Sequence, residues 1–245
     1  MVNSTMLWIT TRCLKDSPLD IALESIGSLT RGVEIIDGGV HRIPSVSLLE
    51  SFPYRYSIRV PQLDINPASV LEPIRQASVA VITERFAFAA EINADVIISP
   101  GYISAPSEFA LARRQLSRSS QDLIHMAQEY GIRFLYRNTG RWSNYLLRTP
   151  EDLTMISSVP LALDVGHAHV NGCLPGFLQD GASRYHYLYD CRGISEDHLE
   201  VGLGSINFSP VATAIYAHGA QGVVDVPTYR GAYNSMRALR HFGIG

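Results

Sequence analysis

The feature that most constrains this chain is a repeated alternation between short apolar runs, four or five residues long, and longer helical stretches. Eight runs of this kind follow one another, and each has the residue types that favour strands. Because parallel strands are buried on both faces, such runs separated by helices predict a parallel sheet with helices on its outer face. The predicted strands are Met6–Thr10, Gly32–Ile36, Tyr54–Ile58, Asp95–Ser99, Ile132–Tyr136, Leu161–Asp164, Arg184–Leu188 and Gly222–Asp225.

The length of the chain favours one way of arranging these eight units. A chain of 245 residues, 46% of them hydrophobic, can bury one large core, and single α/β barrels commonly have this length. We therefore expect residues 1–245 to form a single (β/α)₈ TIM barrel rather than an open doubly wound sheet. Long helices are expected over residues 68–94 and 108–130, and another helix is expected to open at Thr149-Pro150.

Composition restricts the possible partners and the compartment. A net charge of −3 gives no general attraction for nucleic acid or for an anionic membrane, although a local basic patch would not be visible in this total. The sequence shows no apolar stretch of about 18 residues, the length that a membrane span requires, and no secretory leader. Its three cysteines are an odd number and too few for a disulfide scaffold. We expect a soluble, cytoplasmic protein.

Polar and charged residues follow most of the apolar runs. In barrels of this class the chemistry takes place at the carboxyl ends of the strands, so these residues are the candidates for a functional site. The clearest group is Asp164 and His167, which follow one strand, together with Glu196 and His198 further along. Carboxylates and imidazoles are common metal ligands. The other candidates are Thr11, Arg12, Glu34 or Asp37, Arg59, Ser99, Arg137, Asn138, Asp190, Asp225 and either His186 or Tyr187.

Five short blocks in this part of the chain resemble the signature of the xylose-isomerase-like superfamily. That superfamily contains sugar isomerases and epimerases, and also the metal-dependent family 2 apurinic/apyrimidinic endonucleases. The resemblance implies a (β/α)₈ barrel with divalent metal ions, zinc or manganese, at its carboxyl-terminal rim. The blocks are Ser99-Pro-Gly101, Leu163-Asp-Val-Gly-His-Ala-His169, Tyr187-Leu-Tyr-Asp190, Glu196-Asp-His198 and Gly202-Leu-Gly-Ser-Ile206.

Several positions depart from the pattern of that superfamily. Arg59 and Ser99 stand where its endonucleases carry metal-binding histidines, and Arg137 stands where the superfamily has a glutamate before Asn138. Tyr187 aligns with a histidine, although a shift of one residue would supply His186 instead. Asp225 replaces a longer glutamate. A full three-metal nuclease site is therefore not expected.

The positions that match the pattern suggest one remaining metal site. The resemblance implies His167, Glu196, His198 and Asp164 as its ligands, and two histidines with a carboxylate are a common set for a catalytic zinc ion. Asp164 and Asp225 would then move a proton. The alternative is that Asp164 and His167 form hydrogen bonds within the rim and that the other two residues are solvated.

The two arginines suggest a different kind of site. The guanidinium groups of Arg59 and Arg137 could hold a phosphate or carboxylate directly, and Arg12 and Arg192 could add to this pocket. Asn138 is a further candidate for substrate binding. The alternative is that Arg137 pairs with Asp164 or Asp225 and neutralises a site that has lost its metal.

Three functions remain open at the level of sequence. The first is a sugar or sugar phosphate isomerase or epimerase that acts on a small, anionic or sugar-like molecule. The second is hydrolysis of abasic DNA, which requires several metals and a basic surface; neither is evident here, so nucleic acid is a less favoured but open partner. The third is a non-catalytic barrel that binds an anionic small molecule through Arg59 and Arg137.

Overall fold

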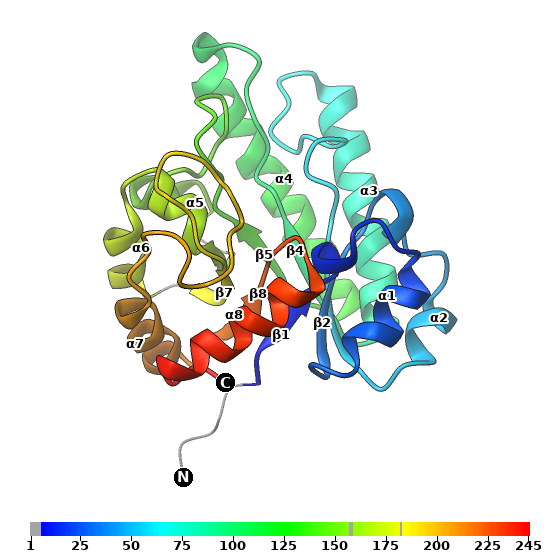
Figure 1. The fold of residues 1–245 in the computed structure, drawn as a ribbon. Coiled ribbons are helices and arrows are strands. Elements are labelled where there is room, and N and C mark those ends of the chain that lie inside the picture. The colour runs from blue at the N-terminus through cyan, green and yellow to red at the C-terminus, as the bar shows by residue number, and fades with distance from the viewer. Residues whose placement is uncertain (1–5, 157–158, 182) are drawn as a thin grey trace.

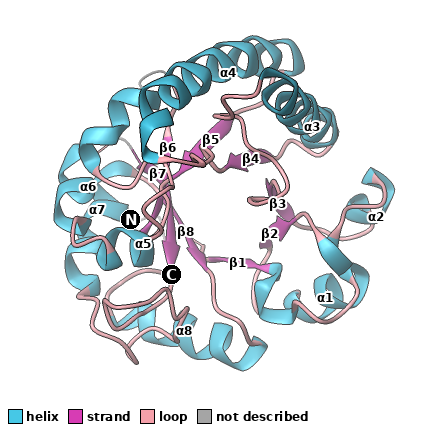
Figure 2. Ribbon diagram, turned by 90° about the horizontal axis from the view of Figure 1, so that it is seen from above, coloured by secondary structure: helices cyan, strands magenta, loops and turns pink. Residues whose placement is uncertain are grey.

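The computed structural model of the chain describes residues 6–156, 159–181 and 183–245. All eight of its strands pair in parallel, each with the next in sequence, and β1 also pairs with β8, so that the sheet is a closed barrel. Figures 1 and 2 show helices surrounding this barrel. The predicted (β/α)₈ fold is confirmed. The strands are β1 (Trp8–Thr10), β2 (Gly32–Ile36), β3 (Arg55–Arg59), β4 (Asp95–Ile98), β5 (Phe134–Arg137), β6 (Leu161–Asp164), β7 (Ser183–Leu188) and β8 (Gln221–Val224).

Helices and short 3₁₀ turns connect the strands. The longest helices, α3 and α4, lie side by side on one flank of the barrel (Figure 2). The α-helices are α1 (Leu19–Ile26), α2 (Val46–Glu50), α3 (Glu72–Glu91), α4 (Phe109–Tyr130), α5 (Val165–Val170), α6 (Leu174–Asp180), α7 (Phe208–His218) and α8 (Tyr229–His241). The 3₁₀ turns are η1 (Thr11–Leu14), η2 (Gly39–His41), η3 (Pro106–Glu108) and η4 (Pro150–Ile156).

The helix expected at Thr149-Pro150 is present after β5 and is of the 3₁₀ type. This helix, η4, begins at Pro150 as predicted. Here Asp152 accepts hydrogen bonds from the backbone N–H groups of Arg148 and Thr149, at 2.8 and 3.1 Å. The acidic first turn thus fixes the start of the helix, as acids at a helix start commonly do, but it does not determine the helix type.

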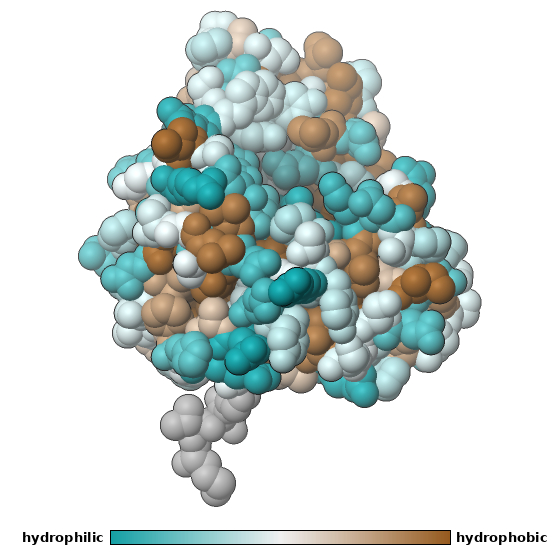
Figure 3. All heavy atoms as spheres, in the orientation of Figure 1, coloured by the Kyte–Doolittle hydropathy of each residue, from teal (hydrophilic) through white to brown (hydrophobic). Residues whose placement is uncertain are grey.

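The core has two layers. One lies between the barrel and its helices, and the other fills the inside of the barrel with the side chains of Trp8, Ile97, Leu135, Ala162, Tyr185, Tyr187 and Val223. On the face drawn in Figure 3, apolar residues lie in separate groups among hydrophilic ones. Within the described ranges, no helix is both long and apolar enough to cross a bilayer.

Candidate functional site

The charged residues at the strand ends meet at the carboxyl-terminal mouth of the barrel. Glu34 of β2, Arg59 of β3, Arg137 of β5 and Asp164 of β6 are buried there, as is Asp225, directly after β8. Parallel strands end at the same rim, so residues far apart in the sequence become neighbours. The mouth is therefore a buried network of charges.

Arg137 and Asp164 form an ion pair between neighbouring strands. Nε of Arg137 donates to Oδ2 of Asp164 at 3.0 Å, and Nη2 donates to the same oxygen. The other carboxylate oxygen accepts hydrogen bonds from the Tyr189 hydroxyl at 2.8 Å and from the backbone N–H of His167 at 2.7 Å. The sequence left two interpretations of Arg137 open, binding of an anionic ligand or pairing with Asp164 or Asp225. The structure contains the pair with Asp164.

Asp225 binds the remaining arginines of the mouth. Nη1 and Nη2 of Arg59 donate to its two oxygens at 3.2 Å each, and Nε of Arg12 donates at 2.8 Å. The Thr10 hydroxyl adds a bond of 2.7 Å, and Nη2 of Arg137 lies 3.5 Å away. The carboxylate of Asp225 thus contacts three guanidinium groups.

These cations hold both aspartates in the charged form. Burial by itself raises the pKa of Asp164, but the charges of His167 and Arg137 outweigh it and lower that pKa to about 2. Burial also opposes ionisation of Asp225, but Arg59 and other cations keep its pKa well below the usual range. Both groups are therefore fixed anions, an arrangement that favours positioning the arginines over proton transfer. Their predicted catalytic roles remain predictions.

Glu34 lies deeper in the barrel, next to Tyr187. The Tyr187 hydroxyl donates to Oε2 of Glu34 at 2.6 Å, and Nε of Arg59 lies 2.9 Å from Oε1. Burial is the largest influence on the pKa of Glu34 and raises it. His186 instead forms a 3.0 Å hydrogen bond with Ser183. The register left open by the sequence is thus settled, since Tyr187 and not His186 contacts the charged network.

His167 and Glu196 form a second, more accessible pair. Nδ1 of His167 lies 3.0 Å from the backbone oxygen of Asn138, and Nε2 lies 3.3 Å from Oε2 of Glu196. Both ring nitrogens thus face oxygen atoms. The carboxylate of Glu196 also accepts the backbone N–H of Arg141 at 2.8 Å and packs tightly against Gly140. The hydrogen bond from His167 lowers the pKa of Glu196.

His198 contacts the rim from the loop that follows β7. Its Nδ1 lies 2.7 Å from the backbone oxygen of Asp225 and 3.7 Å from the carboxylate. Its ring stacks on Tyr189 with 3.9 Å between ring centroids. His198 is therefore held by a backbone oxygen and an aromatic face.

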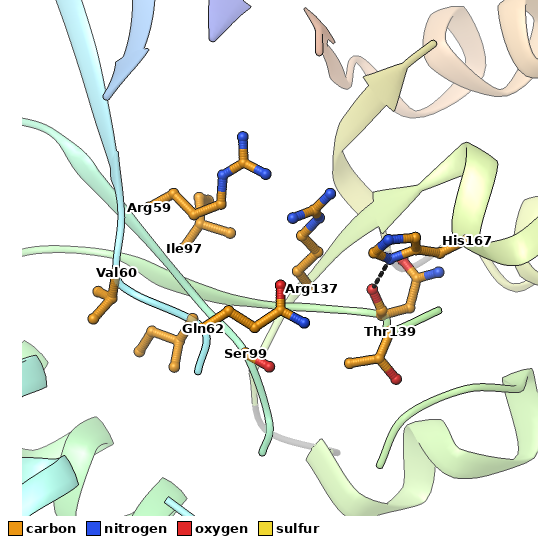
Figure 4. A pocket seen from close by; sticks show the side chains of 10 residues that line it. Arg59, Val60, Gln62, Ile97, Ser99, Arg137, Thr139 and His167 are labelled. Atoms are coloured by element: carbon orange, nitrogen blue, oxygen red, sulfur yellow. Dashed lines mark hydrogen bonds between the residues drawn. The ribbon is translucent and has the colours of Figure 1, made fainter. Parts of the chain in front are cut away.

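A small cavity lies beside this network. It measures about 10 Å³, which is about the space that one water molecule needs. Figure 4 shows Arg59 and Arg137 projecting next to each other, with His167 on the far side of Arg137 and Ser99 and Gln62 nearby. A sugar-sized ligand therefore requires the loops above the cavity to move or must bind on top of it.

The residues predicted as metal ligands do not fit a metal ion in this arrangement. Asp164 is bonded to Arg137, whose permanent positive charge repels a cation, and Nδ1 of His198 faces a backbone oxygen. His167 faces Glu196, and its Nδ1 also lies 3.6 Å from Oδ2 of Asp164. Among the described residues, no three His, Cys, Asp or Glu side chains are grouped so that they could hold a metal. The zinc or manganese site stays a prediction, which this donor set does not favour.

The predicted substrate-binding residues are brought together, but mainly through contacts with one another. Arg12, Arg59 and Arg137 all contact Asp225, and the Asn138 side chain donates to the backbone oxygen of Asp164 at 3.1 Å. Their role in binding a substrate remains a prediction. Sequence reasoning missed Thr10 and Tyr189. The sequence could have identified Thr10, because it is a polar residue at the end of an apolar run. Tyr189 could not be identified in this way, because it resembles an ordinary aromatic residue of a strand.

The fold and the mouth together define a class, the (β/α)₈ barrel proteins with a charged site at the carboxyl-terminal rim. Residues 45–241 match the family model described as the xylose isomerase-like TIM barrel, and the chain belongs to this family. The resemblance noted in the sequence is thereby confirmed.

Curated relatives and solved structures agree with this membership. The chain is 27% identical to the uncharacterized protein MJ1614 of Methanocaldococcus jannaschii over 213 residues, which cover 84% of this chain and 83% of that one. It superposes on a D-tagatose 3-epimerase-like protein with a TM-score of 0.88 and 23% identity, covering 97% and 96% of the two chains. An L-ribulose 3-epimerase gives a TM-score of 0.80 at 14% identity, covering 98% and 94%. These structural similarities establish the fold.

Proposed function

We propose that this protein is a sugar isomerase whose barrel resembles those of the sugar epimerases. Its substrate is a small, anionic, sugar-like molecule that binds at the mouth. The observation that carries the proposal is the pair formed by His167 and Glu196. A third of the Glu196 side chain is exposed, whereas Asp164 and Asp225 are fully buried and bonded to arginines. Glu196 is therefore the carboxylate of this network that a substrate can reach.

The same atoms support a proton-transfer reaction on a hydroxy-carbonyl compound. Glu196 removes a proton from the carbon next to the carbonyl, and the electron pair of that C–H bond forms the double bond of an enediolate. The carbonyl π electrons move to oxygen, where His167 and Arg137 stabilise the negative charge. Nη1 of Arg137 makes none of the hydrogen bonds found among the described residues, so it supplies a donor.

A single exposed base favours isomerisation over epimerisation. Glu196 returns the proton to the neighbouring carbon on the same face, while the hydroxyl proton of the first carbon passes to the former carbonyl oxygen, which converts a ketose into an aldose or the reverse. Epimerisation at one carbon instead needs an acid on the opposite face. Asp164 and Asp225 are poor candidates for that acid because they are ionised and bonded to guanidinium groups. Glu34 is buried deeper in the barrel and bonded to Tyr187.

Solvent hydrogen exchange tests this proposal. The protein is incubated in D₂O with D-tagatose, D-psicose or D-fructose 6-phosphate, and deuterium at the carbon next to the carbonyl is followed by NMR. We expect exchange that falls by about 10²-fold or more in Glu196→Gln. Glu200→Gln is the matched control, because this carboxylate lies on the same loop but bonds to Asn234. Absence of exchange with every probe contradicts the proposal.

Two further measurements distinguish the two alternative functions. Thermal stabilisation by the phosphate ester without exchange would favour the non-catalytic, anion-binding barrel. Cleavage of an abasic duplex with added Zn²⁺ or Mn²⁺ would favour the nuclease. The nuclease has less support here, because the arginines of the mouth are engaged by internal carboxylates instead of facing a DNA backbone.

A further inference from the structure

A second hollow lies at the opposite end of the barrel, where the strands begin. Its volume is about 650 Å³, which is in the range of small-molecule sites. Residues at or just before the starts of several strands line it. They include Trp8, Arg55, Asp95, Arg133, Arg184 and Tyr185.

The hollow carries an excess of positive charge. Arg133 pairs with Asp95, with Nε 2.9 Å from Oδ1. In the described ranges, no carboxylate lies within 4.0 Å of the guanidinium groups of Arg55 or Arg184, and both residues are exposed. Three arginines thus face one aspartate, in a chain whose net charge is −3. Guanidinium groups without a carboxylate partner attract anions.

A buried tryptophan forms part of the wall of this hollow. Trp8 is 6% exposed, and its indole Nε1 makes no hydrogen bond with the described residues. The ring lies across Gly32, where a side chain would collide with it, and Tyr185 packs against it edge-on at 6.0 Å. The guanidinium of Arg55 lies 5.7 Å from the ring centroid. The buried Nε1 lies on the Gly32 side, where an added Cβ would be 2.3 Å from it, so Trp8 contributes packing surface to the hollow and not a donor.

We propose that this hollow is a second binding site, which takes a phosphorylated small molecule. Arg55, Arg133 and Arg184 all offer N–H donors, whereas Asp95 is already engaged by Arg133. A phosphate group presents several acceptor oxygens and matches the guanidinium fork. The aromatic rings of Trp8 and Tyr185 provide the apolar wall on which the rest of such a ligand packs. The site is independent of the mouth and of the proposed isomerase activity.

The two tryptophans of the chain allow the site to be located directly. Trp142 lies on the loop after β5, at the mouth, so the variant Trp142→Phe leaves Trp8 as the reporter of the hollow. We expect ADP and pyrophosphate to change the fluorescence of this variant in a saturable manner. Arg55→Ala and Arg184→Ala, added singly, are each expected to weaken binding about tenfold. Arg114→Ala, an exposed arginine of α4, is the control and leaves the affinity unchanged.

Three outcomes would overturn the proposal. They are no response of Trp8 to either probe, a response that persists unchanged in both arginine variants, and a response seen only from Trp142 in a Trp8→Phe protein. Circular dichroism of each variant confirms that it is folded. The test is separate from that of the isomerase, because Arg55→Ala and Arg184→Ala are expected to leave hydrogen exchange at the mouth unaltered.

Discussion

Arg137 and Asp164 lie at the ends of neighbouring strands, and the guanidinium Nε of one is 3.0 Å from the carboxylate of the other. The Arg137 side chain is 7% exposed and that of Asp164 is fully buried. Either charge would be costly to bury at this depth without the other. The ion pair forms the centre of the mouth.

Replacing Arg137 should destabilise the protein strongly. Arg137→Ala leaves the buried charge of Asp164 without its main partner, and we expect a loss of about 3–5 kcal/mol in the free energy of unfolding. Urea denaturation measures it. The double variant Arg137→Ala, Asp164→Asn should recover part of the loss. Arg133→Ala, which removes the half-exposed partner of Asp95, should cost at most about 1 kcal/mol. An equally small loss in Arg137→Ala would refute the buried-pair argument.

Stability should fall on mild acidification because of His186. Burial lowers the pKa of this histidine to about 3. The unfolded chain therefore binds a proton between about pH 6.5 and pH 3 that the folded chain does not, and stability rises with pH in that range. Each pH unit contributes up to about 1.4 kcal/mol. The free energy of unfolding at pH 7 and pH 5 should differ less in His186→Leu than in the unmodified protein.

A methyl group at Gly140 should displace Glu196. A Cβ at this position would lie 1.7 Å from Oε1 of Glu196, so Gly140→Ala forces the carboxylate away from His167. We expect hydrogen exchange to decrease about 10²-fold, because small displacements of a catalytic group have effects of this size. Gly38→Ala is the control, since its added methyl group meets nothing within 4 Å. Unchanged exchange in Gly140→Ala would exclude Glu196 as the base.

Metal analysis tests the predicted zinc or manganese site, which the arrangement of its ligands does not favour. Protein purified without a chelator or a metal-affinity tag should contain less than one equivalent of zinc or manganese, as measured by mass spectrometry. The physical reason is that Arg137 occupies the carboxylate that would otherwise bind the ion. A stoichiometric metal that disappears in both His167→Ala and His198→Ala would restore the predicted site.

The sequence predicts the barrel well because the barrel depends on local patterns. Short apolar runs and capping residues act over a few positions, and all eight predicted strands match the observed ones to within two residues at each end. In the same way, α4 ends at Gly131, whose left-handed backbone favours glycine. The mouth is less predictable. Arg59 and Asp225 are 166 positions apart, and no local pattern indicates which carboxylate a given arginine will contact.

The register of β7 shows the same limit. A shift of one residue exchanges the two faces of a strand, and the run Tyr185-His-Tyr187 has no clear apolar and polar alternation that would choose between them. Tyr187 contacts Glu34 only because the neighbouring strands fix the register, with Leu163 opposite His186 and Asp164 opposite Tyr187.

The bonds from Thr10 and Arg12 to Asp225 join the first strand of the barrel to the residue that follows its last. During synthesis, Thr10 and Arg12 leave the ribosome long before Asp225 is translated. The mouth therefore cannot form while the chain is incomplete. A nascent chain that ends before Asp225 has Arg12 and Arg59 without the carboxylate that holds them. Whatever the mouth binds, the ability to bind it therefore arises at the end of translation, when the barrel closes.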